Sequence, residues 1–100
     1  MTNNEIAITV VSKVTGVAKS TILSSTREYR AVESRMLIVL LLSRDGASDG
    51  TISWVLNRKR VTILKARHNA LSSLEYSKAF RDKYHRISHL YEQQKSLRVS

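Results

Sequence analysis

The densest group of residues that could bind another molecule lies between residues 57 and 70. This stretch, NRKRVTILKARHNA, holds the cations Arg58, Lys59, Arg60, Lys65 and Arg67. No Asp or Glu occurs from Thr51 to Leu74. An acid-free run of Lys and Arg attracts polyanions, because no nearby negative charge offsets it. The stretch therefore predicts contact with a nucleic acid.

The same stretch has the apolar spacing of an amphipathic helix. At about 100° per residue, the side chains expected to face inward are Ile63, Ala66, Ala70 and Leu74. Those expected to face outward are Val61, Thr62, Lys65, His68 and Asn69. The alternative is a surface helix whose basic face is only solvated.

The start of this helix is basic, although local helix energetics favour acids there. The N-terminus is the positive end of the helix dipole, so Lys or Arg costs a few tenths of a kcal/mol. A basic start suits a helix end that approaches phosphates and base edges, because its free N–H groups, its dipole and its side chains attract the same anion.

Other reactive residue types do not form a recognisable site. His85 and His89 are four residues apart, but no third ligand accompanies them, so we expect no metal. The absence of Cys excludes a thiolate nucleophile, a disulfide framework and a zinc finger. Ser, His and acidic residues show no triad spacing. We therefore expect a non-catalytic protein without a cofactor.

Length and composition predict one small domain. One hundred residues, 42% of them hydrophobic, allow a modest core, and a formal net charge of +9 favours a polyanionic partner. The apolar run at 36–42 is far shorter than the roughly 20 residues that cross a bilayer, and no secretory signal is recognisable. We expect a cytoplasmic domain over residues 1–95, a flexible basic tail at 96–100, and no membrane contact.

The apolar repeats and helix stops predict an all-α fold, a five- or six-helix bundle containing a helix-turn-helix. We expect helices at about 4–15 (ended by Gly16), 19–24, 32–43, 48–56, 59–72 and from Tyr76 onward. The apolar third helix should be central. The link Asn57-Arg58 is too short for anything but a tight helix-turn-helix.

The last helix should close the core. The aromatic and aliphatic residues at helical spacing in it are Tyr76, Phe80, Tyr84, Ile87 and Tyr91. Because these side chains are needed inside, membrane-surface association through this helix is the weaker hypothesis.

Several segments together match a known pattern. They are 10–17 (VVSKVTGV), 22–24 (ILS), Arg27, Arg35 ahead of an apolar helix, and Ile52 followed by 56–63 (LNRKRVTI) and Ala66. Over roughly Ile6 to Tyr91 the chain resembles the C-terminal DNA-binding domain of the bacterial replication initiator DnaA, a helix-turn-helix domain of the Trp-repressor-like superfamily.

The resemblance implies a bacterial or phage-encoded protein of the nucleoid, acting in replication initiation or transcription control. It implies that the second helix of the helix-turn-helix enters the major groove, while a basic loop before the central helix reaches phosphates and the minor groove. It puts Arg27 in that loop, Arg35 at the start of the central helix, and Arg58 and Thr62 in the signature that opens the recognition helix.

The chain departs from this family where bases are read. The family signature has Gly-Arg-Asp-His, then Ser or Thr, then Thr; this chain has Asn57, Arg58, Lys59, Arg60, Val61 and Thr62. Lys and Arg favour guanine, whereas carboxylates favour cytosine amines, at about 1–3 kcal/mol per good pair. We therefore expect different bases to be contacted. The initiator's ATPase domain has no counterpart in this sequence, so we expect no ATP hydrolysis.

The expected DNA-binding residues fall into three groups. The base-edge candidates are Lys59, Arg60, Val61, Thr62 and Lys65, in the first turns of the helix. The candidates for phosphate contacts are Arg27, Arg30, Arg35 and Arg58, with a narrow minor groove as the alternative for Arg27. His68 and Asn69 complete the outer face, His68 as a phosphate or solvent contact.

The sequence allows more than one role for three residues. Arg35 could instead form a structural ion pair with Glu33 or Glu5. The stem of Arg67 could cover the core while its head reaches water. Trp54 could be a partly exposed core residue or an interface anchor.

Double-stranded DNA is the expected partner. A homodimer or a larger protein partner fits as well, because a single recognition helix rarely binds tightly alone. The alternative function is a helical adaptor, or a non-specific nucleic-acid (RNA) binding module, that kept the fold but lost base readout.

Overall fold

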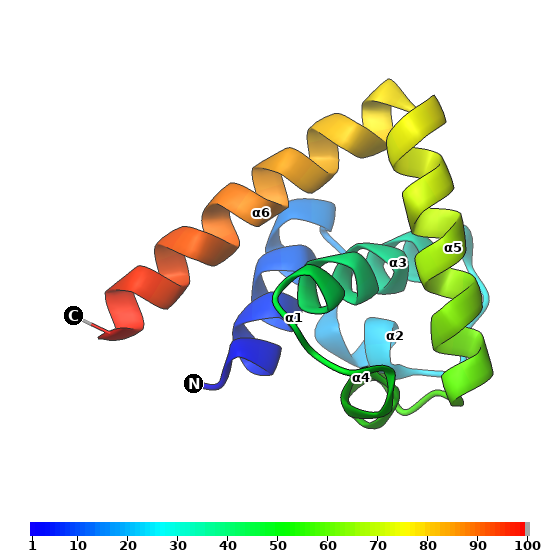
Figure 1. The fold of residues 1–100 in the computed structure, drawn as a ribbon, viewed down its shortest axis with the longest axis horizontal. Coiled ribbons are helices and arrows are strands. Elements are labelled where there is room, and N and C mark those ends of the chain that lie inside the picture. The colour runs from blue at the N-terminus through cyan, green and yellow to red at the C-terminus, as the bar shows by residue number, and fades with distance from the viewer. Residues whose placement is uncertain (100) are drawn as a thin grey trace.

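The protein is all-helical. A computed structural model describes the backbone of residues 1–99 and the side chains of residues 1–97. The helices are α1 (Asn3–Thr15), α2 (Lys19–Leu23), α3 (Tyr29–Arg44), α4 (Asp49–Leu56), α5 (Arg60–Tyr76) and α6 (Lys78–Val99). The prediction of an all-α fold is therefore confirmed, with six helices over the described part of the chain (Figure 1).

Local capping explains where α1 and α4 begin and end. Thr2 and Glu5 form a reciprocal capping box at the start of α1, and Gly16 ends this helix with φ 75°. Ser48 accepts a hydrogen bond from the Thr51 N–H at the start of α4, as predicted. Asn57 ends α4 in the left-handed conformation, with φ 52°.

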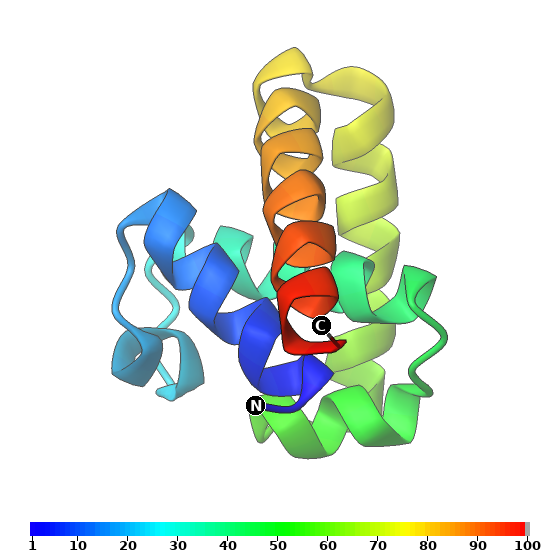
Figure 2. The same ribbon diagram turned by 90° about the vertical axis from the view of Figure 1, so that its left-hand side faces the viewer.

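The central element is α3, as its apolar sequence predicted. Every residue from Leu37 to Leu42 is at most 3% exposed, and α3 packs against α1, α2, α4 and α5. A helix that is apolar on all sides must be covered on all sides. Figure 2 shows α1 and α6 crossing in front of it, and α5 running behind α6.

The last two helices enclose the core from one side. α5 and α6 meet at Ser77 and diverge from that corner, with α1 and α3 between them (Figure 1). The side chains of α6 that face the core are Phe80, Tyr84, Ile87 and Tyr91. The Cα radius of gyration is 12.4 Å, close to the roughly 13 Å of a compact 100-residue domain.

Three expected boundaries differ from the structure by three residues or more. α3 begins at Tyr29 rather than Val32, and α5 continues to Tyr76 because Leu74 still packs on the core. Tyr76 therefore ends α5, is 80% exposed and does not belong to the core stripe, so that prediction was wrong.

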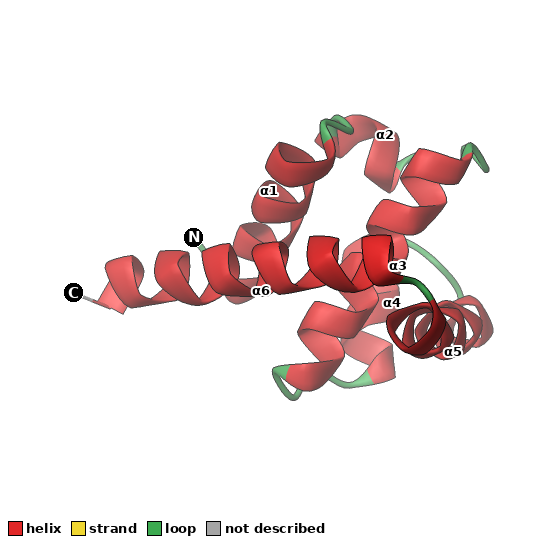
Figure 3. Cartoon of the chain, turned by 90° about the horizontal axis from the view of Figure 1, so that it is seen from above, coloured by secondary structure: helices red, strands yellow, loops and turns green. Residues whose placement is uncertain are grey.

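The third difference lies at the end of the chain. α6 is helical through residues 96–99, where we expected a tail, and its last turns extend past α1 (Figure 3). Ser100 lies outside the described residues. Lys95 pairs with Asp45 and Glu92 beyond the last large core residue, Tyr91, and this supports the additional turns.

Asp45 joins the end of α3 to α6. It accepts hydrogen bonds from Tyr91 Oη at 2.6 Å and from Lys95 Nζ at 3.0 Å. Partial burial alone would raise the pKa of Asp45, but these hydrogen bonds and the charge of Lys95 outweigh it and hold the pKa below its usual value. A carboxyl whose pKa is lowered by folding stabilises the fold above its unfolded pKa, about 4, and loses that contribution as pH falls through the folded value.

We predict that Asp45→Asn lowers the free energy of unfolding by about 1–2 kcal/mol at pH 7, because it removes the charged acceptor of the hydrogen bonds from Tyr91 and Lys95. Between about pH 5 and 3, where free Asp titrates, the free energy of unfolding should also fall less steeply in this variant than in the parent protein. Urea unfolding followed by circular dichroism at each pH would measure both. Asp82→Asn, which removes an exposed pair with Lys78, is the control and should change stability by under about 0.5 kcal/mol. An equal loss of unfolding free energy in Asp45→Asn and Asp82→Asn would contradict the prediction.

Candidate nucleic-acid interface

The start and outer face of α5 are exposed. Ile63 and Ala70 are buried on its inner face, and Ala66 and Leu74 pack on the core beside them, as predicted. Val61 is 54% exposed. Lys65, His68 and Asn69 lie on the same outward side and reach solvent. The helix therefore keeps a long outer surface that no other described element covers.

A groove of about 510 Å³ separates α5 from the loop at residues 24–28. Its walls come from that loop, from the link at 57–59 and from one side of α5, and its floor is apolar. The polar lining residues are Ser25, Thr26, Arg27, Arg35, Asn57, Arg58, Lys59, Thr62, Lys65 and Asn69. The lining contains no Asp or Glu. The fold thus gathers seven of the eleven expected DNA-binding residues around one groove.

Three of the cations at this groove have no internal partner. Arg27, Lys59 and Lys65 are exposed and form no hydrogen bond or ion pair through their side chains within residues 1–97. Their charges are satisfied only by solvent and counterions. They are the residues that an incoming anion can bind without breaking an existing contact.

Arg35 is largely buried, and its guanidinium is engaged within the fold. It is 8% exposed, and its guanidinium donates to the carbonyls of Ile22 (2.7 Å), Thr26 (2.8 Å), Ser24 (2.9 Å) and Thr21 (3.3 Å). Burial and the nearby charge of Arg58 lower its pKa. With its donors engaged, Arg35 ties the segment from Thr21 to Thr26 to α3.

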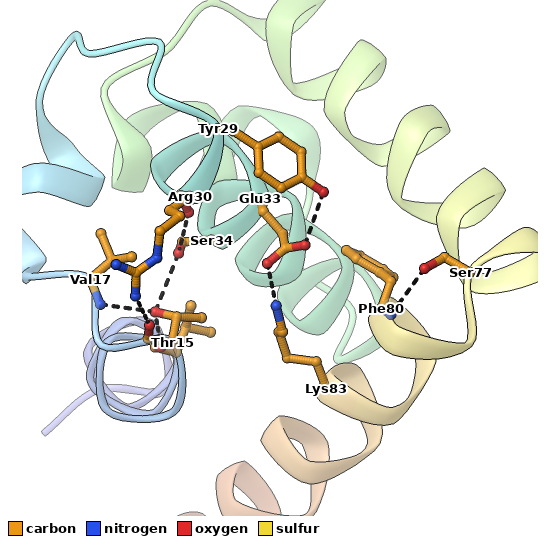
Figure 4. Close-up of polar contacts among 10 residues, drawn as sticks. Thr15, Val17, Tyr29, Arg30, Glu33, Ser34, Ser77, Phe80 and Lys83 are labelled. Carbon is orange, nitrogen blue, oxygen red and sulfur yellow. Dashed lines mark hydrogen bonds and ion pairs between the residues drawn. The ribbon is translucent and has the colours of Figure 1, made fainter.

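The ion pairs considered for Arg35 are not formed among the described residues. Glu33 pairs with Lys83 of α6 at 2.6 Å and accepts a hydrogen bond from Tyr29 (Figure 4). Glu5 belongs to the capping box of α1. The carbonyl partners of Arg35 are backbone atoms brought near by folding, which no spacing in the sequence indicates.

Arg58 joins the two walls of the groove. Its guanidinium donates to the Ser24 carbonyl across the groove and to the Leu56 and Asn57 carbonyls at 3.1 and 3.2 Å. Ser53 Oγ in turn donates to the Arg58 carbonyl. The link between α4 and α5 is therefore fixed relative to the 24–28 loop.

Four expected site residues lie outside the groove. Arg30 donates to the Thr15 carbonyl at the end of α1 (Figure 4). Arg60 lies over α4, where a Cβ at Gly50 would be 2.5 Å from its Nη2. Val61 and His68 lie on α5 but do not line the groove. Arg30 is thus engaged elsewhere, whereas Val61 and His68 remain on the outer face of α5.

Arg67 stabilises the packing of α5 on α4. Its guanidinium binds both carboxylate oxygens of Asp49, the first residue of α4. The hydrogen bond from Arg67 lowers the pKa of Asp49, and the same bond raises the pKa of Arg67. Asp49 is therefore paired internally.

The start of α5 also offers free backbone donors. Its N-cap residue, Lys59, makes no side-chain capping hydrogen bond. The first N–H groups of a helix have no partner within it, so an uncapped and exposed start is suited to an anion. These N–H groups lie next to the groove, because Lys59 and Thr62 line it.

Metal ligation and membrane crossing find no support in the described residues. No group of three or more His, Asp or Glu side chains in this part of the chain is arranged to hold a metal ion. None of the helices described is both long and apolar enough to cross a membrane.

Sequence reasoning did not select Ser25 and Thr26, which line the groove beside Arg27. Their position in the polar connection before the apolar third helix, where the resemblance places a basic loop, is the feature that could have identified them.

Two comparisons of the sequence with known proteins found no match. No protein-family model matches the chain, and no curated protein sequence is significantly similar to it.

We predict that Arg35→Ala lowers the free energy of unfolding by about 3 kcal/mol, since it leaves buried carbonyls without a donor. Arg35→Lys should also be destabilised, because an ammonium group cannot reproduce the planar set of donors. Urea unfolding by circular dichroism measures both. Arg27→Ala removes an exposed cation from the same groove and should stay within about 0.5 kcal/mol of the parent. An Arg35→Ala protein as stable as Arg27→Ala would show that the carbonyl contacts do not stabilise the fold.

Proposed function

We propose that this protein binds double-stranded DNA and has no catalytic activity. The observation that carries the proposal is the acid-free groove at which Arg27, Lys59 and Lys65 lie without internal partners. Cations that are already exposed and unpaired can release counterions from the DNA on binding, which is the main source of affinity for a phosphate backbone.

In this proposal α4, residues 57–59 and α5 are a helix-turn-helix, and α5 is the recognition helix. The major groove of B-DNA is about 12 Å wide and accepts an α-helix of about 10–12 Å diameter. The 17 residues of α5 span about 25 Å, so several turns can follow the groove. Its exposed outer face supports this placement.

The exposed side chains at α5 form two groups, one on the outer face of the helix and one facing the groove. Val61, Lys65 and His68 lie on the outer face of α5 and would meet base edges, with Val61 against a thymine methyl and Lys65 on a guanine. Lys59, Thr62 and Asn69 face the groove beside α5 and would contact one phosphate strand, together with the free N–H groups at the start of the helix.

Arg27 would contact the next stretch of backbone or the minor groove from the 24–28 loop. Arg35 and Arg58 hold that loop and the link at 57–59 together, so they would position the contacts without touching DNA. The resemblance to the C-terminal domain of DnaA supports the same arrangement, and with it a place in the bacterial cytoplasm at the nucleoid.

The first test is selection from randomised DNA duplexes at about 0.15 M salt, where non-specific binding is weak. We expect one short motif to be enriched, containing guanine and thymine at the positions facing Lys65 and Val61. A duplex RNA of the same sequence should bind more weakly, because its deep and narrow major groove excludes a helix. If no motif is enriched and RNA binds equally well, specific DNA recognition is the claim that fails.

The second test removes two of the unpaired cations. Lys59→Ala with Lys65→Ala should weaken duplex binding. The negative slope of log K against log salt should become shallower by about 1, for the phosphate that Lys59 no longer neutralises. The loss of Lys65 should in addition weaken the preference for guanine in the selected motif. Fluorescence anisotropy of a labelled duplex at several salt concentrations measures this.

The matched control is Lys13→Ala with Arg86→Ala, which removes two exposed cations from α1 and α6 outside the groove lining. Circular dichroism should show both double variants to be folded. The control should lose less affinity, and less of its salt dependence, than Lys59→Ala with Lys65→Ala. If it loses as much, the choice of α5 as the binding face is wrong.

A further inference from the structure

The most exposed large apolar residue of α4 is Trp54. Ile52 and Leu56 are fully buried on the inner face of this helix, whereas Trp54 is 82% exposed. It is the only tryptophan in the chain. Indole combines a large apolar ring with one N–H donor, and leaving it in water gives no packing energy to the free protein. Such exposure is typical of a contact residue.

The surroundings of Trp54 are basic. It shares a shallow depression with Gly50, Ser53, Asn57, Arg58 and Lys59, and this lining contains no acid. Lys59 lines the groove beside α5 as well, so the two surfaces are continuous.

Arg60 adds a further cation, because its guanidinium lies against Gly50. Asp49, one residue earlier, is engaged by Arg67. A second copy of this chain, which carries a net charge of +9, would bring like charges together at this surface. Charge complementarity points to a polyanion.

We propose that Trp54 is a further DNA-contacting residue, packing on the sugar-phosphate strand that borders the groove occupied by α5. This inference rests on the proposed function. With α5 in the major groove, the link at 57–59 faces one strand, and Trp54 lies beside that link on α4. The indole N–H donates to a phosphate oxygen and the ring covers the deoxyribose, so both parts of the side chain find partners.

Trp54 itself supplies the readout, because it is the only tryptophan. A duplex with the selected motif is titrated into the full chain, with anisotropy of the labelled DNA and tryptophan emission followed together. We expect the emission to shift to shorter wavelength with the same midpoint as the anisotropy, because the indole leaves water when DNA binds.

Substitutions at Trp54 distinguish its own contact with DNA from the salt-dependent binding of the cations. Trp54→Ala should weaken affinity about tenfold. The salt slope should stay unchanged, since no charge is removed. Trp54→Phe should recover part of the affinity by restoring an aromatic ring without the N–H. Tyr76→Ala is the matched control, an aromatic residue 80% exposed at the other end of α5, and should change affinity less than about twofold.

The outcomes distinguish the two claims. If the duplex binds but the emission does not move and Trp54→Ala binds like the parent, this inference is overturned while the proposed function stands. If the parent shows no duplex binding by anisotropy, both fail. If the emission shifts with protein concentration in the absence of DNA, Trp54 is covered by a second copy, and this inference is likewise overturned.

Discussion

The proposed interface depends on one buried guanidinium. Arg35 lies in the first half of the apolar helix α3 and donates to four carbonyls of the segment from Thr21 to Thr26. Those carbonyls end α2 and begin the loop that forms one wall of the groove, and a buried carbonyl without a donor costs about 1–3 kcal/mol. Arg58 then donates to the carbonyl of Ser24 from the other wall. The distance between Arg27 and the start of α5 is therefore set by two arginines whose donors are already engaged.

This arrangement divides the basic residues into two groups. Arg30, Arg35, Arg58 and Arg67 bind carbonyls or a carboxylate and hold helices and loops together. Arg27, Lys59 and Lys65 have no such partner in the described part of the chain, and they meet at one groove. A net charge alone would not separate the two groups, since every cation contributes equally to it. Only unpaired cations can exchange solvent for phosphate while internal contacts stay intact, and this is why the groove carries the proposed function.

Periodicity and capping residues were enough to predict the helices, because both act within one turn of the chain. The inward residues Ile63 and Ala70, the left-handed Gly16 and the Ser48 cap are examples. The same local pattern failed at Tyr76, where the spacing suited the last helix but the chain continues α5 and then turns at Ser77. It failed again at residues 96–99, where helix continues after the apolar pattern has ended and contacts of Lys95 with Asp45 support it. Both errors concern helix ends, which depend on partners distant in sequence.

The sequence by itself determined the helical class, the central apolar helix and the acid-free basic stretch at 57–70, since residue type and local spacing suffice for these. The tertiary structure decided which of the selected cations are available. Arg35 and Arg30 were chosen by type and position, yet folding brings carbonyls of other elements to both. From its sequence, Trp54 could be a partly exposed core residue or an interface anchor, and the packing of α4 through Ile52 and Leu56 leaves it exposed. The physical reason is that the charge of a side chain belongs to its sequence, whereas its hydrogen-bond partners and its exposure arise only when distant segments meet.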